Sequence, residues 1–437
     1  MLAELSSAQA ALVWVLAAGG QAGVLAAWKM LLPRLRSPQR VAWGAAVLAG
    51  QLLLLGLWRA LLYPLFGGEQ LILRMVSAAV VSFIVVAAMM PRLIRWLMRQ
   101  KFGDRPEFDH AALNELTRHK SDTPTMGGIL IAAAIFTGTL LFADLGSMYV
   151  RMAFIVLVWL AGLGAVDDWM KLRNACHAAA PAGAPTTGGR DGLKMWQKIL
   201  FQIALAVLLA IFIYAHGRES RVLNELGQPI NTAHHFYFPF RAAPVYLPLL
   251  AYVIITIMVI VGSSNAVNLT DGMDGLAGGC MVIVTGVFLL LSWVAGVKAW
   301  ADLFALPFVP QAAELTVVCA SMVGACVGFL WYNCLPAQVF MGDTGSLPLG
   351  GLIGYIAVVT RQELMLFIAG GVFVMEAVSV LLQIGYFKST HGKRLFRIAP
   401  IHHHFHLAGW AESKVVVRFW LLCLLCAAVA LASLKLR

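Results

Sequence analysis

Long apolar runs, separated by short polar segments, recur along nearly the whole chain. A helix of about 20 apolar residues crosses a hydrocarbon core of roughly 30 Å. The runs do not alternate in polarity at every second residue, as the strands of a membrane barrel do. They therefore predict an all-α integral membrane protein with twelve spans, at about 9–32, 41–66, 75–98, 124–143, 149–168, 196–215, 245–264, 273–297, 312–332, 345–360, 364–384 and 415–434.

Five polar clusters interrupt this pattern, and each lies at the edge of an apolar run. A carboxylate costs roughly 2.5–3.5 kcal/mol or more at a bilayer centre. Carboxylates gathered at the ends of spans therefore indicate a site at the membrane surface, suited to phosphates and a divalent cation. The clusters are His119–Gly128, Asp167–Lys171, Asn268–Gly275, Met341–Ser346 and His402–His406.

The distribution of charge orients the chain. Of the 437 residues, 60% are hydrophobic and 12% are charged, and the net charge is +11. No aromatic–basic module accompanies this charge, so no nucleic acid is expected as a partner. Basic loops mark the cytoplasmic side of a membrane protein and meet anionic lipid. All five clusters fall on the more basic side, which holds the loops 99–123, 169–195, 265–272, 333–344 and 385–414.

Adjacent carboxylates end the span 149–168. Asp167 and Asp168 repel each other unless a cation neutralises them, and Lys171 follows one helical turn later. The pair is consistent with a metal or phosphate site, with a base, or with an ordinary charged helix end.

Hard oxygen donors recur in the next two clusters. Asn268, Asp271 and Asp274 are spaced three residues apart, and oxygen ligands of this kind suit magnesium. Asp343 stands in a glycine-rich turn before a span, where backbone N–H groups favour anions. A capping role for Asp343 is the alternative. Asn333 closes the preceding span and is expected to face Asp343 across a short loop.

The remaining two clusters supply cations, hydroxyls and imidazoles. Lys120 is a candidate phosphate or nucleotide contact, next to hydroxyls and the Gly127–Gly128 pair, and Phe340 could stack on a base. The run His402–His404 could bind zinc, donate to phosphates or form a solvated loop. Basic neighbours favour phosphate.

Taken together, the five clusters closely resemble those of the bacterial phospho-MurNAc-pentapeptide translocases, within the polyprenyl-phosphate N-acetylhexosamine-1-phosphate transferase superfamily. The resemblance runs from about Met75 onward in the family's order, and it includes Pro124–Gly128 and Gly409–Trp420. The family has ten spans with both ends outside. Residues 73–437 are therefore expected to form a ten-span transferase domain, and 1–72 an additional pair of transmembrane helices.

The resemblance implies a reaction at the inner face of the bacterial cytoplasmic membrane. Phospho-MurNAc-pentapeptide moves from UDP-MurNAc-pentapeptide to undecaprenyl phosphate, giving lipid I and UMP, with Mg²⁺ as cofactor. Asp343 is the implied metal ligand. The implied catalytic residues are Asp167, Asp168, Asp271 and His404. The implied substrate-binding residues are Lys120, Thr125, Lys171, Asn268, Asp274, Asn333, Phe340, His402 and His403.

The chain departs from the family pattern in a few places. His406 replaces a usual acidic residue, Asp122 replaces a usual glycine, and the loop 174–192 is longer than typical. These differences bear on fine substrate contacts more than on the class of reaction. Homodimerisation is left open by the sequence.

Alternatives remain at this stage. Within the same fold the chain could transfer GlcNAc-1-phosphate, and in another class it could be a cation-coupled secondary transporter, which predicts acidic residues near span midpoints. For the transferase, we expect a single displacement in which Asp167 positions the lipid phosphate or removes its proton. A covalent phospho-aspartate intermediate is the rival mechanism.

Overall fold

Helices make up most of the described chain. The computed structural model describes residues 56–57, 59–60, 63, 70–99, 120, 123–178, 192–216, 232–238 and 244–434, with the side chains of 174–178 excepted. Within these residues the only sheet is one antiparallel pair, β1 (His235–Phe236) with β2 (Val245–Tyr246). The first predicted span and most of the second lie outside the described residues, as does Asp122.

Each span predicted from residue 75 onward coincides with a helix, except 364–384, which is two helices. Eight helices in the described part of the chain are long and apolar enough to cross a membrane, and two shorter apolar helices accompany them. The protein is thus an all-α, multi-pass membrane protein. The eight are α3 (Leu71–Arg99), α6 (Met148–Ala178), α7 (Met195–His216), α8 (Leu249–Thr270), α9 (Leu276–Gly296), α11 (Leu315–Asn333), α14 (Gly371–Ser389) and α16 (Glu412–Ser433).

The two shorter helices are α5 (Gly128–Phe142) and α12 (Asp343–Val359). The remaining helical elements are short: η4 (Thr232–His234), α10 (Lys298–Leu303), η5 (Ala312–Glu314), α13 (Glu363–Ala369) and α15 (Ile401–Leu407).

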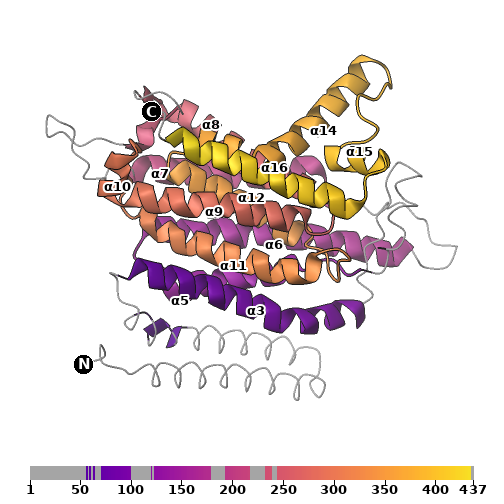
Figure 1. Ribbon diagram of the computed structural model, residues 1–437, viewed down its shortest axis with the longest axis horizontal. Helices are drawn as coiled ribbons and strands as arrows, with labels where there is room; N and C mark the ends of the chain where they lie inside the picture. The colour runs from indigo at the N-terminus through magenta and orange to yellow at the C-terminus, as the bar shows by residue number, and fades with distance from the viewer. Residues whose placement is uncertain are drawn as a thin grey trace.

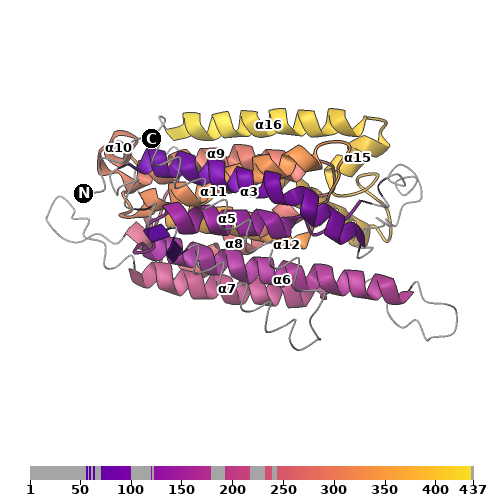
Figure 2. The same ribbon diagram turned by 90° about the horizontal axis from the view of Figure 1, so that it is seen from below.

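Helix α12 forms the centre of the bundle. Every residue of this helix is buried, as expected for a helix that is apolar on all sides. It packs mainly against α6 and α8, while α3, α5, α9 and α11 form an adjoining layer (Figures 1 and 2). Glycines permit the close contacts: a Cβ on Gly164 of α6 would lie 2.2 Å from the Asp343 carbonyl oxygen, and one on Gly128 of α5 would lie 2.2 Å from Gly345 N.

Several helix ends differ from the prediction. Helix α6 continues to Ala178 and α8 to Thr270, so Asp167, Asp168 and Asn268 lie inside helices rather than at their ends or in a loop. Their polar side chains are paired within the protein and do not need water, which lets the helix continue. The predicted span 364–384 is two helices, α13 and α14, which meet at Gly370. Figure 1 shows α14 projecting away from the bundle.

A buried ion pair joins elements at the end of the bundle where α3 begins and α5 ends. The Arg74 side chain is 2% exposed and donates to both carboxylate oxygens of Glu314, at 2.9 and 2.7 Å. Arg74 also donates to the Phe142 carbonyl, and Glu314 accepts the Asp144 N–H. The contacts hold α3, the end of α5 and η5 together.

Candidate active site

The polar clusters meet where α12 begins. Asp168 on α6 accepts the N–H of Asp343 at 3.2 Å, the N–H of Thr344 at 2.9 Å and the Thr344 hydroxyl at 2.6 Å. A carboxylate at a helix N-terminus satisfies free N–H groups and is favoured by the helix dipole. Gly342 has a φ of 71°, a conformation that glycine adopts readily. Asp168 therefore caps α12 and fixes the position of Asp343.

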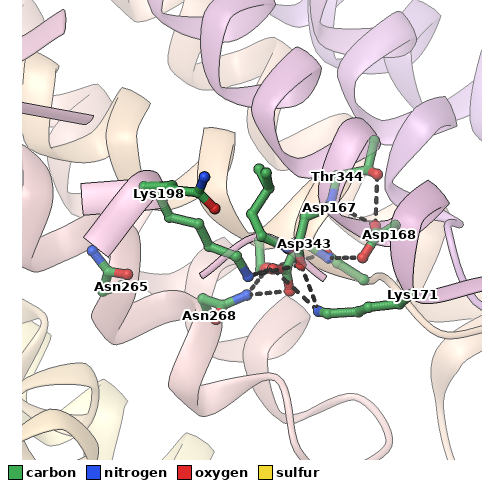
Figure 3. A network of polar contacts seen from close by, with 12 residues as sticks. Asp167, Asp168, Lys171, Lys198, Asn265, Asn268, Asp343 and Thr344 are labelled. Atoms are coloured by element: carbon green, nitrogen blue, oxygen red, sulfur yellow. Dashed lines mark hydrogen bonds and ion pairs between the residues drawn. The ribbon is translucent and has the colours of Figure 1, made fainter. Parts of the chain in front are cut away.

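Two lysines neutralise the other two carboxylates. Lys198 Nζ on α7 lies 2.7 Å from Asp167 Oδ2 and 2.7 Å from Asp343 Oδ2 (Figure 3). Lys171 Nζ lies 2.7 Å from the same Asp167 oxygen and 3.4 Å from Asp343 Oδ2. The other Asp167 oxygen accepts the Leu193 N–H. Asp167 is fully buried, while the Lys171 side chain is 42% exposed, so the cluster opens on the Lys171 side.

Helices α7 and α8 support this arrangement through amide and hydroxyl groups. The Asn268 side-chain amide donates to Asp343 Oδ1 at 2.8 Å and to the Ser346 hydroxyl at 2.9 Å. One turn earlier, the Asn265 side-chain amide donates to Gln202 Oε1 at 2.7 Å. Gln202 is fully buried and lies on the same helix as Lys198. The contacts fix α7 against α8 and so hold Lys198 at the carboxylates.

The donor set fits a divalent cation. Asp167, Asp168 and Asp343 each offer a carboxylate oxygen, and these three oxygens lie within 4.8 Å of one another. Magnesium prefers oxygen ligands and usually keeps several waters and substrate phosphates in its shell. Since both Asp168 oxygens already cap α12, Asp343 and Asp167 are the better candidates to hold the ion. Lys171 and Lys198 supply positive charge beside these two carboxylates, and a bound ion would add to it.

Asp271 follows α8 and faces the same cluster. Burial raises the pKa of Asp271 to about 7, and the nearby carboxylates of Asp343 and Asp168 raise it further in the same direction. Gly272 comes next and is exposed. The turn thus places a carboxylate that binds a proton easily beside the candidate metal ligands.

A second polar group lies where α9 begins and α11 ends. Lys120 Nζ lies 2.6 Å from Asp274 Oδ1 and 2.5 Å from Glu412 Oε1. The other Asp274 oxygen accepts the Ala337 N–H, and Glu412 also accepts the Asp274 N–H. Asn333 accepts the Gly275 N–H and donates to the Val339 carbonyl. Lys120, Asp274 and Asn333, all expected to bind substrate, are therefore brought together, and Glu412 joins them.

Residues 124–128 pair with the segment before Asp343. The N–H of Phe340 donates to the Pro124 carbonyl, and the N–H of Gly127 donates to the Phe340 carbonyl, both at 2.8 Å. A Cβ on Gly342 would lie 3.1 Å from Thr125 Oγ1 and 2.7 Å from Asp168 Oδ2. Thr125 and the half-buried Phe340 thus flank the turn that carries Asp343.

The histidine run forms a helix and not a solvated loop. His402 and His403 on α15 are buried, and their Nε2 atoms lie 2.4 and 3.2 Å from the position of a Cβ on Gly272. Burial, followed by the neighbouring His402, lowers the pKa of His403 to about 2, so this ring is neutral near pH 7. His404 points elsewhere: its Nδ1 accepts the Arg397 N–H, and its ring meets Phe396 edge-on.

Three charged residues of this region were not singled out from the sequence. They are Lys198, Glu376 and Glu412. Lys198 and Glu376 lie inside predicted apolar spans, where a charged residue is unusual and by itself indicates function. That signal could have identified these two. Glu412 lies just before a span, where charged residues are common, and its role depends on long-range contacts.

Comparison with known proteins agrees with this geometry. Residues 150–361 match the model of glycosyl transferase family 4. Residues 120–131 match phospho-N-acetylmuramoyl-pentapeptide-transferase signature 1. The fold and the site therefore define a membrane-embedded glycosyl transferase of this class.

Individual relatives narrow the class. The chain is 40% identical to a phospho-N-acetylmuramoyl-pentapeptide-transferase of Desulfotalea psychrophila over 385 residues, which covers 86% of this chain and 99% of the relative. It is 45% identical to the protein of the same name from Koribacter versatilis, over 73% of this chain and 82% of the relative. One from Rickettsia bellii is 42% identical over 79% of this chain and 89% of the relative. The chain belongs to the phospho-N-acetylmuramoyl-pentapeptide-transferase family.

Proposed function

We propose that this protein transfers phospho-MurNAc-pentapeptide from UDP-MurNAc-pentapeptide to undecaprenyl phosphate, giving lipid I and UMP. The observation that carries the proposal is the pairing of Asp167 and Asp343 with two lysines from separate helices, at the start of the buried helix α12. A site of this kind holds both positive charge and metal ligands next to the membrane. The active site then lies on the cytoplasmic face of the bacterial inner membrane.

The main obstacle to the reaction is the repulsion between two anionic substrates. A phosphate monoester has its second pKa near 6, so the lipid phosphate is largely dianionic at neutral pH and hardly needs a base. The ammonium groups of Lys171 and Lys198 offset that repulsion, and Lys171 is exposed enough to meet an incoming phosphate. Asp167 holds both lysines in place, and this is the role that its contacts support.

Magnesium is the proposed cofactor. When bound, Mg²⁺ would stabilise the charge that develops on the diphosphate. Asp343 would hold the ion, with Asp167 beside it, since their carboxylates have oxygen atoms that a single ion can reach. Asn268 keeps the Asp343 carboxylate oriented by donating to its other oxygen.

The uridine end of the donor is proposed to bind at the second polar group. Lys120, Asp274 and Asn333 are held there by mutual contacts and by Glu412. Phe340 is half-buried and precedes Asp343 by three residues in the chain, and its aromatic ring is suited to stacking on the base. Thr125, next to Asp168, would contact the diphosphate between the two regions.

A single displacement is the proposed mechanism. The oxygens of Asp167 accept contacts from Leu193, Lys171 and Lys198, and those of Asp168 cap α12, so neither side chain is poised as a free nucleophile. The test is to incubate the purified enzyme with the donor and Mg²⁺ but without lipid phosphate. We expect no sugar-phosphate adduct on the protein by mass spectrometry. A trapped adduct on an aspartate would establish the covalent route instead.

The proposed reaction is tested by UMP release in detergent. We expect release from UDP-MurNAc-pentapeptide that requires both undecaprenyl phosphate and Mg²⁺, with lipid I as the second product. Competition with UDP-GlcNAc separates the muramyl donor from the GlcNAc-1-phosphate alternative. Transfer from UDP-GlcNAc at equal or greater efficiency would contradict the proposed substrate.

The alternative of a cation-coupled transporter is disfavoured because Asp167, Asp271 and Asp343 gather at one end of the bundle. Analytical ultracentrifugation would test whether the protein forms a homodimer.

A further inference from the structure

A fully buried carboxylate on α14 has no part in the contacts described so far. Glu376 is 0% exposed, and α14 is one of the helices long and apolar enough to span the membrane. Its Oε2 lies 3.1 Å from His402 Nδ1, and His402 is also 0% exposed. Among the described residues, both Glu376 oxygens and both His402 ring nitrogens are buried without a hydrogen bond, so the 3.1 Å contact is an ion-pair approach and Nε2 is left without a partner. An ionisable residue retained inside a membrane helix at such cost indicates a function.

The opposite side of the same ring faces the candidate active site. A Cβ on Gly272 would lie 2.4 Å from His402 Nε2, which shows how closely the ring approaches this turn. Gly272 directly follows Asp271, whose carboxylate lies near Asp343 and Asp168. The His402 ring therefore extends from Glu376 in α14 to the turn after α8. The absence of a side chain at residue 272 is what gives Nε2 access to that turn.

We propose that Glu376 is a positioning residue that holds His402 so that Nε2 donates to the phosphate or sugar end of the donor. The proposal rests on the proposed transferase function. A carboxylate behind one ring nitrogen fixes the orientation of an imidazole and compensates the positive charge it acquires while its other nitrogen serves a substrate. Glu376 does this from inside the membrane helix and does not touch the substrate.

A double-mutant cycle tests the coupling between the two residues. The variants are Glu376→Gln, His402→Gln and the double variant, with kcat and KM measured for UMP release. The loss of a residue that supports a ligating or donating imidazole typically costs roughly 10–100-fold. We expect Glu376→Gln to lower kcat by this factor with KM changed less than about threefold, and to add no further loss in the His402→Gln background.

The matched control lies one turn along the same helix. Ser379 is buried and its hydroxyl donates to the Glu376 carbonyl, so Ser379→Ala perturbs α14 without touching the carboxylate. We expect near-wild-type turnover from this variant. Losses for Glu376→Gln and His402→Gln that simply multiply in the double variant, or wild-type kcat for Glu376→Gln, would overturn the proposal.

A variant on the other side of the ring covers the case in which Glu376→Gln fails to fold. Gly272→Ala retains both Glu376 and His402 but displaces Nε2, so it should lower kcat without lowering the unfolding temperature by more than a few degrees. A wild-type kcat for Gly272→Ala would overturn the proposed role of His402 Nε2 at this turn.

If the wild type itself releases no UMP, the proposed reaction fails. The same cycle is then read from the rise in unfolding temperature caused by UDP-MurNAc-pentapeptide: non-additive losses support the coupling, and additive ones refute it.

Discussion

At the level of single residues, the candidate active site pairs buried carboxylates with the ammonium groups of lysines. Asp167 and Asp343 come from helices α6 and α12, and Lys198 comes from α7. Lys198 Nζ lies 2.7 Å from an oxygen of each carboxylate, so one ammonium group offsets the repulsion between the two. Substitution of any one of them should therefore affect both the chemistry and the stability of the site.

Replacement of the proposed metal ligand should abolish turnover. Asp343→Ala removes a carboxylate that would hold Mg²⁺, and we expect UMP release to fall by at least about 10²-fold, the scale of losing one strong electrostatic contribution. The exposed carboxylate Asp302, on α10, gives the matched control, Asp302→Ala. Near-wild-type turnover of Asp343→Ala in magnesium would rule out its metal role.

Lys198 should stabilise the folded protein when no magnesium is bound, because its ammonium group lies between the two candidate metal ligands. Lys198→Met removes one of two ammonium groups between Asp167 and Asp343, so the carboxylates repel each other unless a cation replaces it. We expect a lower unfolding temperature in EDTA and recovery with Mg²⁺, measured by thermal unfolding in detergent. Lys194→Met, at an exposed lysine just before α7, is the control. Equal midpoints with and without Mg²⁺ in the Lys198 variant would contradict the prediction.

Asp271 should make stability depend on pH. Its pKa rises from 3.8 to about 7 in the folded protein, so the folded state binds the extra proton and loses stability as pH rises through this window. Asp271→Asn removes this penalty. In EDTA, we expect the variant to gain more in unfolding temperature over the wild type at pH 8 than at pH 4. A gain that is the same at both pH values would show that Asp271 is ionised throughout.

At the scale of elements, the glycines of α6 and α5 decide how near α12 can come. The Asp343 carbonyl lies against Gly164, and Gly345 lies against Gly128. Asp168 then caps α12 from the same face of α6. The helix that carries the proposed metal ligand is thus placed by a close backbone contact and by a side-chain cap.

Two glycines on α6 allow a matched test of this contact. A Cβ at position 164 would lie 2.2 Å from the Asp343 carbonyl, whereas a Cβ at Gly162 would meet nothing within 4 Å. We expect Gly164→Ala to destabilise the protein by about 1–3 kcal/mol, as overpacking does, and to lower turnover by displacing Asp343. Gly162→Ala should be neutral or stabilise by up to about 1 kcal/mol, as a helical alanine does. The measurements are unfolding temperature and UMP release; equal effects of the two would contradict the close contact.

In the molecule as a whole, the candidate active site and the buried Arg74–Glu314 ion pair lie in different regions of the described chain. The carboxylates and lysines gather where α12 begins, while the buried Arg74–Glu314 pair lies where α3 begins and α5 ends. Helices α3, α5 and α11 connect the two regions (Figure 2). Stability and turnover should therefore respond separately to changes at the two ends.

Breaking the Arg74–Glu314 pair tests this separation. Glu314→Gln leaves a guanidinium that is 2% exposed without its carboxylate. Loss of one partner of a buried pair costs about 3–5 kcal/mol, and the partial exposure of Glu314 should place the loss at or below the lower value. We expect a reduced unfolding temperature with kcat within about twofold of wild type at 20 °C, where both proteins remain folded. A large fall in kcat at that temperature would show that the two ends are coupled.

The apolar pattern of the chain and the order of its polar residues were enough to predict the class of fold and most members of the site. Apolar runs must be helical in a membrane, because backbone groups there have to be paired within the same segment, and this predicted every described span from residue 75 onward. Polar residues at the edges of those runs, together with their order, indicated the family and residues such as Asp343 and Lys120. The ends of α6 and α8 were wrong because polar side chains there are satisfied by partners that are distant in sequence.

Which of these residues meet, and what each one contacts, follows from the packing of the helices and not from the local sequence. Asp168 caps α12 across 176 positions of sequence, Lys198 bridges two carboxylates, and Glu376 lies behind His402. No local pattern encodes these pairings, because hydrophobic periodicity specifies which face of a helix is buried but not which neighbouring helix covers it. The packing of small residues around α12 selects the neighbours, and the neighbours give each charge its partner.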